Sequence, residues 1–437
     1  MSHPKVTVLY HYFHPDDVVS ARHFDGLCRG LAERGWDVLV RPCNRGCRDE
    51  SQTYPLKEDW NGITIRRVWR PRFRQSSNFG RLLNAAWMLV AWSLPIGRRP
   101  DALIVGTDPI LSVLVAISWR LTRPGVKIAH WAFDLYPEAT VADGMLRADS
   151  VLVRALRSAL RVAYGCCDLI ADLGGCMRRL LEKYHRQSEP AARARVKENT
   201  LARVAGSPTR DRPRPRRVTL VPWALSEPDR PAPPDPVVRK ELFGDAALGL
   251  LYSGNFGRAH SYEEILALAR HLRDAGTTIC FAVRGNRADE LRKAVRPDDG
   301  NVTFAGFAPE SELEKRLSAA DVHLVSLRPE WTGIVVPSKF FGSLAAGRPV
   351  VFAGGPDSAI AGWVREFDVG WVLTADNVAE VAADLRSLAG DPTRLAELQR
   401  RCHAVYHQHF SWAAVTAGWD RELRRLLPGR FRRTAPW

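Results

Sequence analysis

The residues best suited to chemistry lie in the stretch Leu250–Glu264, which reads LLYSGNFGRAHSYEE. An apolar run leads into the Gly254–Gly257 loop, and an amphipathic stretch of helix length follows. Glycines at a strand-to-helix turn let backbone N–H groups face a phosphate, and the helix dipole adds positive potential. Arg258 and His260 would add further donors. Because the spacing is not that of GxGxxG, an ordinary structural turn is the alternative.

A second candidate is the stretch Gly333–Val351, which reads GIVVPSKFFGSLAAGRPVV. We expect Ser338 to cap a helix and Lys339 to lie in its first turn. A cation in the first turn opposes the helix dipole, so this placement is better explained if an anion binds there. The alternative is a surface lysine without a role. Gly333, Ser338 and Lys339 are the candidate binding residues of this stretch.

A third candidate is His130–Glu138, which reads HWAFDLYPE and follows an apolar run. Its carboxylates, Asp134 and Glu138, would lie at the carboxyl edge of a sheet, where open α/β sheets bind ligands. They could bind sugar hydroxyls or take a proton. The alternative is that Asp134 caps a helix and Glu138 pairs with an arginine.

Positioning these motifs requires parallel sheets. Short apolar runs alternate with amphipathic stretches of helix length, for instance 22–33, 263–274 and 312–320. The predicted strands are 6–10, 37–40, 63–68, 102–106, 127–131, 169–171, 248–252, 279–283, 302–304, 322–327 and 349–352. Buried strands that alternate with helices predict parallel sheets. Because the alternation occurs twice, we expect an α/β fold with two doubly wound, Rossmann-like domains.

The boundary between the domains is predicted at the proline-rich segment Ser226–Pro236, which reads SEPDRPAPPDP. Such a segment continues neither a helix nor a central strand, although it could also be a surface loop within one domain. We therefore predict a first domain over residues 1–225, a linker over 226–240 and a second domain over 241–411. A C-terminal helix over 412–437 can cross back to the first domain.

The composition points to an anionic partner, since the formal net charge of the 437 residues is +15. Two segments concentrate this charge. Arg186–Arg217 is a proline-containing basic insertion, and Arg66–Pro100 carries eight arginines, no acid and the apolar core Leu82–Gly97. That core spans about 24 Å as a helix, which is too short to cross a membrane. With Trp87 and Trp92 inside, it fits a helix in the headgroup layer of an anionic membrane; a core helix with a solvated arginine face is the alternative.

The cysteines and the N-terminal sequence indicate the cellular compartment of the chain. The eight cysteines form no CxxC pair, so their spacing does not favour a zinc site. The start MSHPKVTVLY has no signal-peptide pattern. We expect a cytoplasmic chain with free thiols.

Several motifs, taken in order, resemble those of a known family, the retaining GT-B glycosyltransferases of family four. The similarity is specifically to the bacterial subgroup that builds capsule, O-antigen and exopolysaccharide and carries a VPSK motif. The motifs are TDPILS (107–112), DLYPE (134–138), LVPWAL (220–225), YSGNFG (252–257), NVTFAGF (301–307), SAADVHLVSL (318–327) and VPSKFFGSLAAGRPVV (336–351).

The resemblance implies two Rossmann-like domains facing across a cleft, with the nucleotide sugar mainly on the second. It implies that Asp134 and Glu138 face the donor sugar as catalytic residues. The implied donor-binding residues are Gly254, Asn255, Gly257, Arg258, Gly306, Phe307, Gly333, Ser338 and Lys339. Of these, Gly254–Arg258 and Ser338-Lys339 would hold the diphosphate, and Gly306-Phe307 would meet the base.

This chain departs from the family pattern at four positions. Gly342 and Ile334 stand where many members carry a pair of glutamates, the second of which grips the ribose. Asn255 replaces a frequent basic residue, and Phe133 replaces a frequent histidine. These changes put the usual ribose contact and the usual histidine role in doubt.

Our main hypothesis is a retaining glycosyltransferase that is peripheral on the inner face of the cell membrane. The co-substrate would be a nucleotide sugar, UDP ahead of GDP, and the acceptor a lipid-linked or polysaccharide saccharide. No metal would be required, since no DxD motif stands where a metal–diphosphate bridge belongs, and no nucleic acid is expected. The alternatives are a UDP-sugar epimerase of the GT-B type, and a non-catalytic binding protein.

Overall fold

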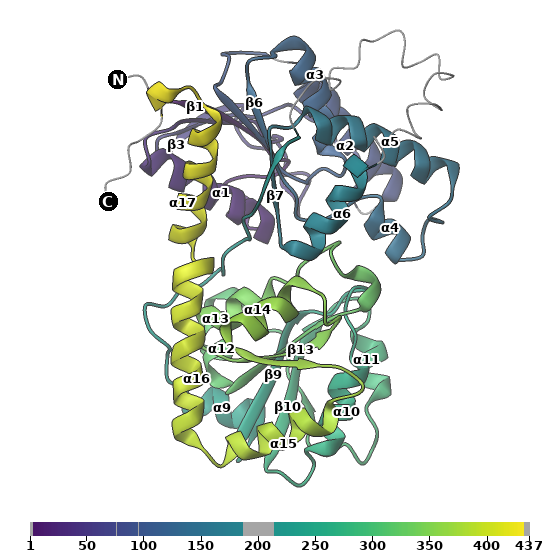
Figure 1. The fold of residues 1–437 in the computed structure, drawn as a ribbon, viewed down its shortest axis with the longest axis vertical. Coiled ribbons are helices and arrows are strands. Elements are labelled where there is room, and N and C mark those ends of the chain that lie inside the picture. The colour runs from purple at the N-terminus through teal and green to yellow at the C-terminus, as the bar shows by residue number, and fades with distance from the viewer. Residues whose placement is uncertain (1–2, 76, 95, 187–213, 432–437) are drawn as a thin grey trace. The chain divides into compact units, whose positions relative to one another are not determined.

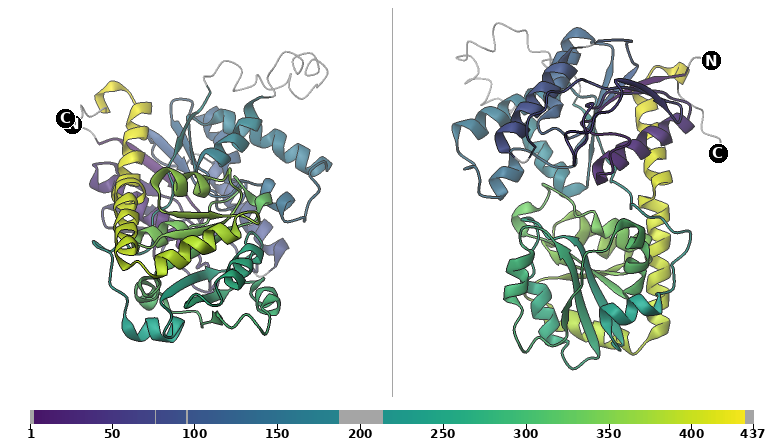
Figure 2. Two further views of the ribbon diagram at one scale, coloured as in Figure 1. Left: turned by 60° about the horizontal axis from the view of Figure 1, so that its bottom comes forward. Right: turned by 180° about the vertical axis from the view of Figure 1, so that it is seen from behind.

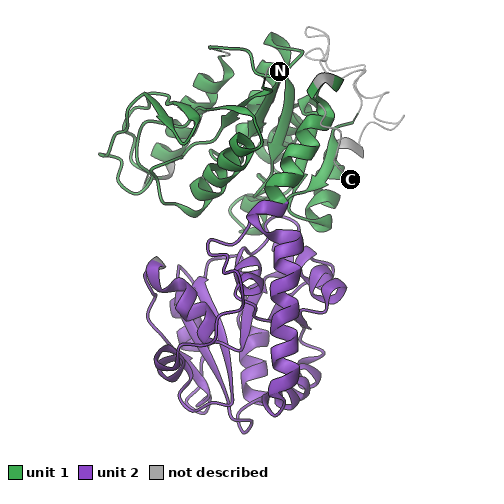
Figure 3. Cartoon of the chain, turned by 90° about the vertical axis from the view of Figure 1, so that its left-hand side faces the viewer, with its two compact units in different colours: residues 1–221, 415–437 green, residues 222–414 purple. Residues whose placement is uncertain are grey.

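The computed structural model describes residues 3–75, 77–94, 96–186 and 214–431. It divides the chain into two compact units, residues 1–221 together with 415–437, and residues 222–414 (Figure 3). The first unit ends at Val221, where the sequence placed the boundary after Leu225. Most of the predicted basic insertion, residues 186–217, lies outside the described residues.

The first unit contains an eight-stranded sheet in the order β3-β4-β2-β1-β5-β6-β7-β8. Neighbouring strands pair in parallel, except β3 with β4. Its strands are β1 (Lys5–Leu9), β2 (Asp37–Val40), β3 (Lys57–Trp60), β4 (Ile63–Arg66), β5 (Ala102–Val105), β6 (Lys127–Trp131), β7 (Leu169–Asp172) and β8 (Arg216–Thr219).

The second unit contains a six-stranded sheet, in which all neighbours are parallel, in the order β11-β10-β9-β12-β13-β14. Its strands are β9 (Leu248–Asn255), β10 (Thr277–Arg284), β11 (Val302–Phe304), β12 (Val322–Leu327), β13 (Val350–Gly354) and β14 (Gly370–Leu373). Figure 1 labels β9, β10 and β13 of this sheet. Two parallel Rossmann-like sheets are thus confirmed, and every predicted strand is present. The sequence missed β3, β8 and β14, which are edge strands.

Helices connect the strands of each sheet. In the first unit these are α1 (Val19–Glu33), α2 (Asn78–Ser93), α3 (Val115–Thr122), α4 (Glu138–Ala142), α5 (Val151–Cys166) and α6 (Gly175–Arg186). In the second they are α9 (Pro236–Phe243), α10 (Glu263–His271), α11 (Ala288–Ala294), α12 (Leu313–Ala319), α13 (Lys339–Ala345), α14 (Ala359–Phe367), α15 (Val378–Ala389) and α16 (Pro392–Val405). Short helical turns are η1 (Ser112–Leu114), η3 (Glu310–Glu312), η4 (Pro329–Trp331), η5 (Tyr406–Phe410) and η6 (Gly429–Phe431).

Local sequence explains where several helices begin. The Asp235 carboxylate accepts from the backbone N–H groups of Val237 and Val238, and Pro236 occupies the first turn of α9. Ser150 and Ser358 cap α5 and α14 in the same way. The proline-rich segment before α9 belongs to the second unit and packs on it, since Arg348 donates to the Ala232 carbonyl at 2.8 Å.

The last helix, α17 (Trp412–Leu426), joins the first unit from residue 415 onward. It lies beside α1, as the views in Figures 1 and 2 agree, and a side chain at Gly30 would meet Thr416 at 2.7 Å. Trp36 Nε1 donates to Asp420 at 2.7 Å, and the buried Trp419 packs against Trp131 at 5.3 Å between ring centroids. The C-terminal helix is therefore part of the core of the first unit.

Replacing Trp419 by alanine is expected to destabilise the first unit by about 3–5 kcal/mol, because the large side chain is fully buried. Chemical denaturation followed by a probe in that unit measures the effect. Trp69, which is 53% exposed, is the matched control, and its alanine variant should lose less than about 1 kcal/mol. Equal losses of unfolding free energy in the two variants would show that α17 does not contribute to the hydrophobic core of the first unit.

Candidate active site

Both sheets reverse their strand order at one point, between β1 and β5 in the first unit and between β9 and β12 in the second. Open parallel sheets bind ligands at the carboxyl ends of the strands at this reversal. The loops that follow β9 and β12 contain most of the predicted donor-binding residues. The predicted carboxylates of the first unit follow β6, one strand beyond the reversal.

At the end of β9, Lys339 reaches back from the start of α13. Its Nζ donates to the Asn255 carbonyl at 2.9 Å and lies 3.3 Å from His260 Nε2. Gly254 allows this approach: its φ is +123°, and a Cβ there would lie 3.0 Å from the Lys339 Cε. A residue with a side chain would be strained at this φ and would push the lysine away. The structure thus brings Gly254, Asn255 and Lys339 together.

Burial and neighbouring charge set the protonation states of Lys339 and His260. Burial lowers the pKa of Lys339 from 10.5 to about 8, and its Nζ lies 5.4 Å from the centroid of the Tyr252 ring. Burial, and then the charge of Lys339, lower the pKa of His260 to about 3, so the imidazole is neutral. His260 Nδ1–H donates to the Ser326 carbonyl at 2.7 Å, which leaves Nε2 as an acceptor. The expectation that His260 offers a donor to a ligand is therefore wrong.

A further glycine supports the loop after β9, and sequence reasoning missed it. Gly285, at the end of β10, has a φ of +130°, and a Cβ there would lie 2.6 Å from both Asn255 Oδ1 and the Phe256 carbonyl. A Cβ at Gly257 would make a tight contact, 3.2 Å from Asn255 Nδ2. A glycine directly after a buried strand, in Arg284-Gly285-Asn286, was the signal that could have revealed this support.

The other predicted donor-binding residues lie in the connections after β9, β11 and β12. Arg258 is exposed, and Gly333 adopts a φ of +81° in the connection from β12 to α13. Ser338 precedes α13, but its side chain makes no capping hydrogen bond, so the predicted cap is wrong: its backbone already has helical angles, φ −64° and ψ −18°.

Gly306 and Phe307 follow the edge strand β11. The Gly306 carbonyl accepts from Arg316 Nη1 at 2.8 Å, which fixes the turn. The Phe307 ring is 47% exposed, and the Arg284 guanidinium lies 3.9 Å from its centroid. A planar guanidinium stacked on an exposed ring is a surface suited to a flat aromatic ligand.

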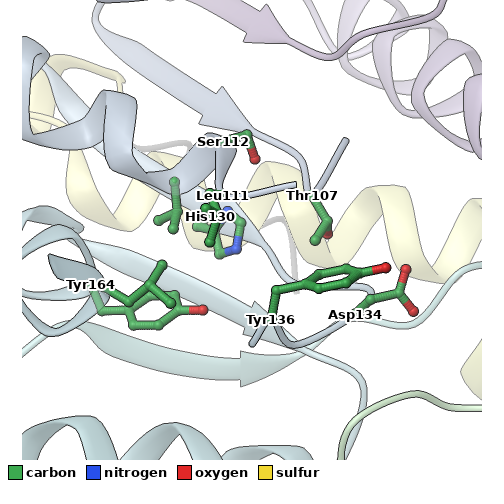
Figure 4. A pocket seen from close by; sticks show the side chains of 9 residues that line it. Thr107, Leu111, Ser112, His130, Asp134, Tyr136 and Tyr164 are labelled. Atoms are coloured by element: carbon green, nitrogen blue, oxygen red, sulfur yellow. The ribbon is translucent and has the colours of Figure 1, made fainter. Parts of the chain in front are cut away.

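In the first unit, Asp134 is exposed and lines a small pocket together with Thr107, Tyr136 and Tyr164 (Figure 4). Figure 4 shows its carboxylate beside the Tyr136 side chain. Desolvation of the carboxylate by the residues packed around it, and then the negative charge of Asp108, raise the pKa of Asp134 to about 6. Asp134 does not cap α4, which begins at Glu138 without a side-chain cap.

Glu138 is held by its neighbours. Its Oε1 accepts from Arg157 Nε at 3.2 Å and from the Tyr184 hydroxyl at 2.7 Å. Its Oε2 is buried and has no hydrogen-bond partner among the described residues. The arginine pairing that the sequence offered as an alternative is therefore present, whereas the role of Glu138 in chemistry stays a prediction.

His11 and Asp108 follow β1 and β5 at the strand reversal, and neither was predicted as a site residue, although Asp108 belongs to the TDPILS motif. His11 Nδ1 lies 3.4 Å from Asp108 Oδ1. Burial lowers the pKa of His11, but the neighbouring Asp108 and Cys43 raise it overall, to about 9. Their positions directly after two predicted strands were a usable signal. Within the described ranges, no group of three or more His, Cys, Asp or Glu side chains is arranged to hold a metal ion.

Comparison with known proteins shows which sequences this chain is similar to. Residues 248–391 match the family model "Glycosyl transferases group 1". Over 307 residues, 68% of this chain and 70% of the relative, the sequence is 26% identical to the probable glycosyltransferase WbjE of Pseudomonas aeruginosa.

Solved structures show the same fold. Sucrose-phosphate synthase from Thermosynechococcus elongatus gives a TM-score of 0.63 at 15% identity, over 97% of this chain and 99% of that one. WaaG, a glycosyltransferase involved in lipopolysaccharide biosynthesis, gives 0.57 at 14% identity, over 95% and 98%. HepE of Anabaena, in complex with UDP and glucose, gives 0.59 at 13% identity, over 96% and 99%.

The fold and the matched domain define the class of this protein: it is an enzyme, a glycosyltransferase with the GT-B type of fold. The group 1 domain covers β9 to α15, and it therefore contains Gly254, His260 and Lys339.

Proposed function

We propose that this enzyme transfers a sugar from a nucleotide diphosphate sugar to a lipid-linked saccharide at the inner face of the cell membrane, with retention of configuration. The bond from the sugar C1 to the diphosphate breaks, and a bond from C1 to the acceptor oxygen forms. The diphosphate leaves with the bonding electrons, and the acceptor hydroxyl loses its proton to it. The observation that carries the proposal is the Lys339 ammonium held over the glycine loop at the end of β9.

The chemistry of Lys339 supports a diphosphate ligand. An ammonium has three N–H donors, and Asn255 and His260 account for two of them. The third, together with the backbone of the glycine loop and the exposed Arg258, suits phosphate oxygens. A cation beside the departing diphosphate would stabilise the charge that develops there, so the proposal requires no metal.

The base and the acceptor are proposed from an exposed ring of the second unit and from the relatives of this chain. The exposed Phe307 ring, backed by Arg284, offers a stacking surface for the base. HepE of Anabaena was solved with UDP and glucose, which supports UDP ahead of GDP. The likeness to WbjE, and to WaaG of lipopolysaccharide biosynthesis, supports a role in cell-surface polysaccharide biosynthesis. The motif order described above supports retention.

The surface of α2 supports contact with a membrane. One face of this helix is buried through Ala85, Met88 and Trp92. The opposite face exposes large apolar side chains: Phe79 is 69%, Leu82 56% and Val90 66% exposed. Exposed arginines flank α2 in the sequence, at positions 66, 72, 74, 98 and 99, and Arg81 lies in α2 itself. An apolar face on a segment rich in arginine fits the headgroup layer of an anionic membrane. Among the described residues, no helix is long and apolar enough to cross a bilayer.

Replacing Lys339 by alanine should weaken the binding of nucleoside diphosphate about 10- to 150-fold. The reason is the loss of a charged hydrogen bond worth roughly 1.5–3 kcal/mol. Isothermal titration with UDP and GDP measures the effect. The control is Lys315→Ala, which removes an exposed lysine from α12 of the same unit. A folded Lys339 variant with wild-type affinity would refute the donor assignment.

Asp134→Asn should lower kcat and kcat/KM together without lowering the melting temperature, because Asp134 makes no cap and its raised pKa means that the ionised carboxylate does not stabilise the fold. If the ionised carboxylate is the active form, wild-type turnover rises as pH rises through about 6. The asparagine variant should lack this dependence. Glu138→Gln should instead lower the melting temperature, since it weakens the contacts to Arg157 and Tyr184. Normal turnover in both folded variants would remove the first-unit carboxylates from the site.

Binding to vesicles that contain anionic lipid should weaken when four exposed arginines near α2 become glutamine, by about 1 kcal/mol for each one near the surface. The variant changes Arg66, Arg72, Arg74 and Arg81. Flotation measures the bound fraction, which should also fall as salt rises. The control removes the same charge from exposed arginines of the second unit, at Arg292, Arg296, Arg394 and Arg400.

A second variant, Leu82→Ser with Val90→Ser, keeps the charge and removes exposed apolar area. It should also float less. If both α2 variants float like wild type, this face does not meet the membrane.

A further inference from the structure

His260 stands out because its ring is held at both nitrogens and neither faces a ligand. Nδ1–H donates to the carbonyl of Ser326, near the end of β12, and Nε2 meets the ammonium of Lys339. The ring also contacts two aromatic residues of β9 and its loop, Tyr252 at 6.1 Å and Phe256 at 5.7 Å between centroids. These contacts fix the ring's position and its plane.

The bond to Ser326 decides the tautomer. A carbonyl can only accept, so Nδ1 must carry the proton, and Nε2 of the neutral ring presents its lone pair. Lys339 has no lone pair in its charged state, so the ammonium is the donor of the 3.3 Å contact. A neutral histidine that accepts a hydrogen bond in this way orients one N–H of the lysine. It leaves the positive charge of the ammonium unchanged.

The charged groups around the ring favour this state. Arg287 donates to the backbone carbonyl of His260, and Glu290 pairs with Arg287 at 2.6 Å. Arg328 donates from its backbone N–H to the Ala259 carbonyl at 2.8 Å. None of the contacts described for the imidazole is to a carboxylate, and the nearest charge is the Lys339 ammonium. Protonating the ring would place two cations 3.3 Å apart, so the ring stays neutral.

We propose that His260 is a positioning residue, whose neutral imidazole fixes the Lys339 ammonium with its remaining N–H directed at the donor's diphosphate. It acts through Lys339 and does not touch the ligand. The inference rests on the proposed function, since it assigns His260 a purpose only if Lys339 binds the diphosphate. Both groups that hold this pair then come from the strand reversal: β9 provides the glycine loop that contacts Lys339, and β12 provides the Ser326 carbonyl that contacts His260.

Two near-isosteric variants separate the two contacts of the ring. His260→Asn retains an amide donor at the position of Nδ1 but has nothing at the position of Nε2. His260→Gln extends an amide oxygen to about the position of Nε2 and so retains an acceptor for Lys339. We expect the asparagine variant to bind nucleoside diphosphate about tenfold more weakly, and the glutamine variant to stay within about threefold of wild type.

The decisive measurement is a double-mutant cycle of His260→Asn with Lys339→Ala, made on the full chain by calorimetry. The probes are UDP, GDP, ADP and dTDP, and the tightest binder is carried forward. If His260 acts only through Lys339, the asparagine substitution should cost nothing further once Lys339 is alanine. A tenfold loss in both backgrounds would overturn the inference, because it would show a structural role or a direct contact.

The pH dependence supplies a readout that a merely structural role would not move. The charged lysine binds the diphosphate, so affinity falls as pH rises through the pKa of Lys339, about 8 in the wild type. Without the acceptor of His260 the ammonium is less stabilised, and its pKa falls further. The loss of affinity in the asparagine variant should therefore begin at a lower pH. An unshifted profile would count against the proposal.

The remaining outcomes are also decisive. If the asparagine variant does not fold, the glutamine variant carries the test, and a folded glutamine variant with a tenfold loss overturns the inference. If Lys339→Ala binds every nucleotide like wild type, the donor assignment of the proposed function fails and takes the inference with it. If Lys339→Ala weakens binding while His260→Asn does not, only the inference fails.

Discussion

The close approach of the Lys339 side chain to the end of β9 is the contact on which the candidate donor site depends. It requires a residue without a side chain at position 254, in a backbone conformation that glycine alone adopts without strain. It also requires the loop at Asn255 and Phe256 to lie against Gly285 of the neighbouring strand, where a Cβ would collide with both. Two glycines on adjacent strands thus set where one ammonium group lies.

Holding a lysine in this position works against the stability of the folded chain. Its described partners, a carbonyl, an imidazole nitrogen and an aromatic ring, are all neutral, and burial lowers the pKa of the amine. A partly desolvated cation without a counter-charge is stabilised when an anion arrives. Local instability of this kind is common at sites where binding energy must be released on contact with a ligand.

The two sheets use the same geometry with different charged groups. In the second unit, the reversal point carries the Lys339 cation and a neutral histidine. In the first unit, it carries the Asp108 carboxylate and His11, whose pKa that carboxylate raises, with Asp134 after the next strand, β6. A cationic edge suits phosphate oxygens, whereas carboxylates suit hydroxyl groups and developing positive charge. One fold, used twice, therefore provides two different chemical surfaces through the residues in its loops.

The sequence by itself determined the buried strands and the glycine loop at the end of β9, because both are encoded in local patterns of apolar residues and turn residues. It missed β3 and β8 because KEDW and RRVT are polar and only partly buried, and it missed β14 because GWVL is a short, partly buried run at a sheet edge. Only the tertiary structure decided what the polar side chains do. Glu138 is paired by Tyr184, 46 residues away, and His260 meets Lys339, 79 residues away. The proton on an imidazole and the availability of a carboxylate depend on such distant partners, which no local pattern specifies.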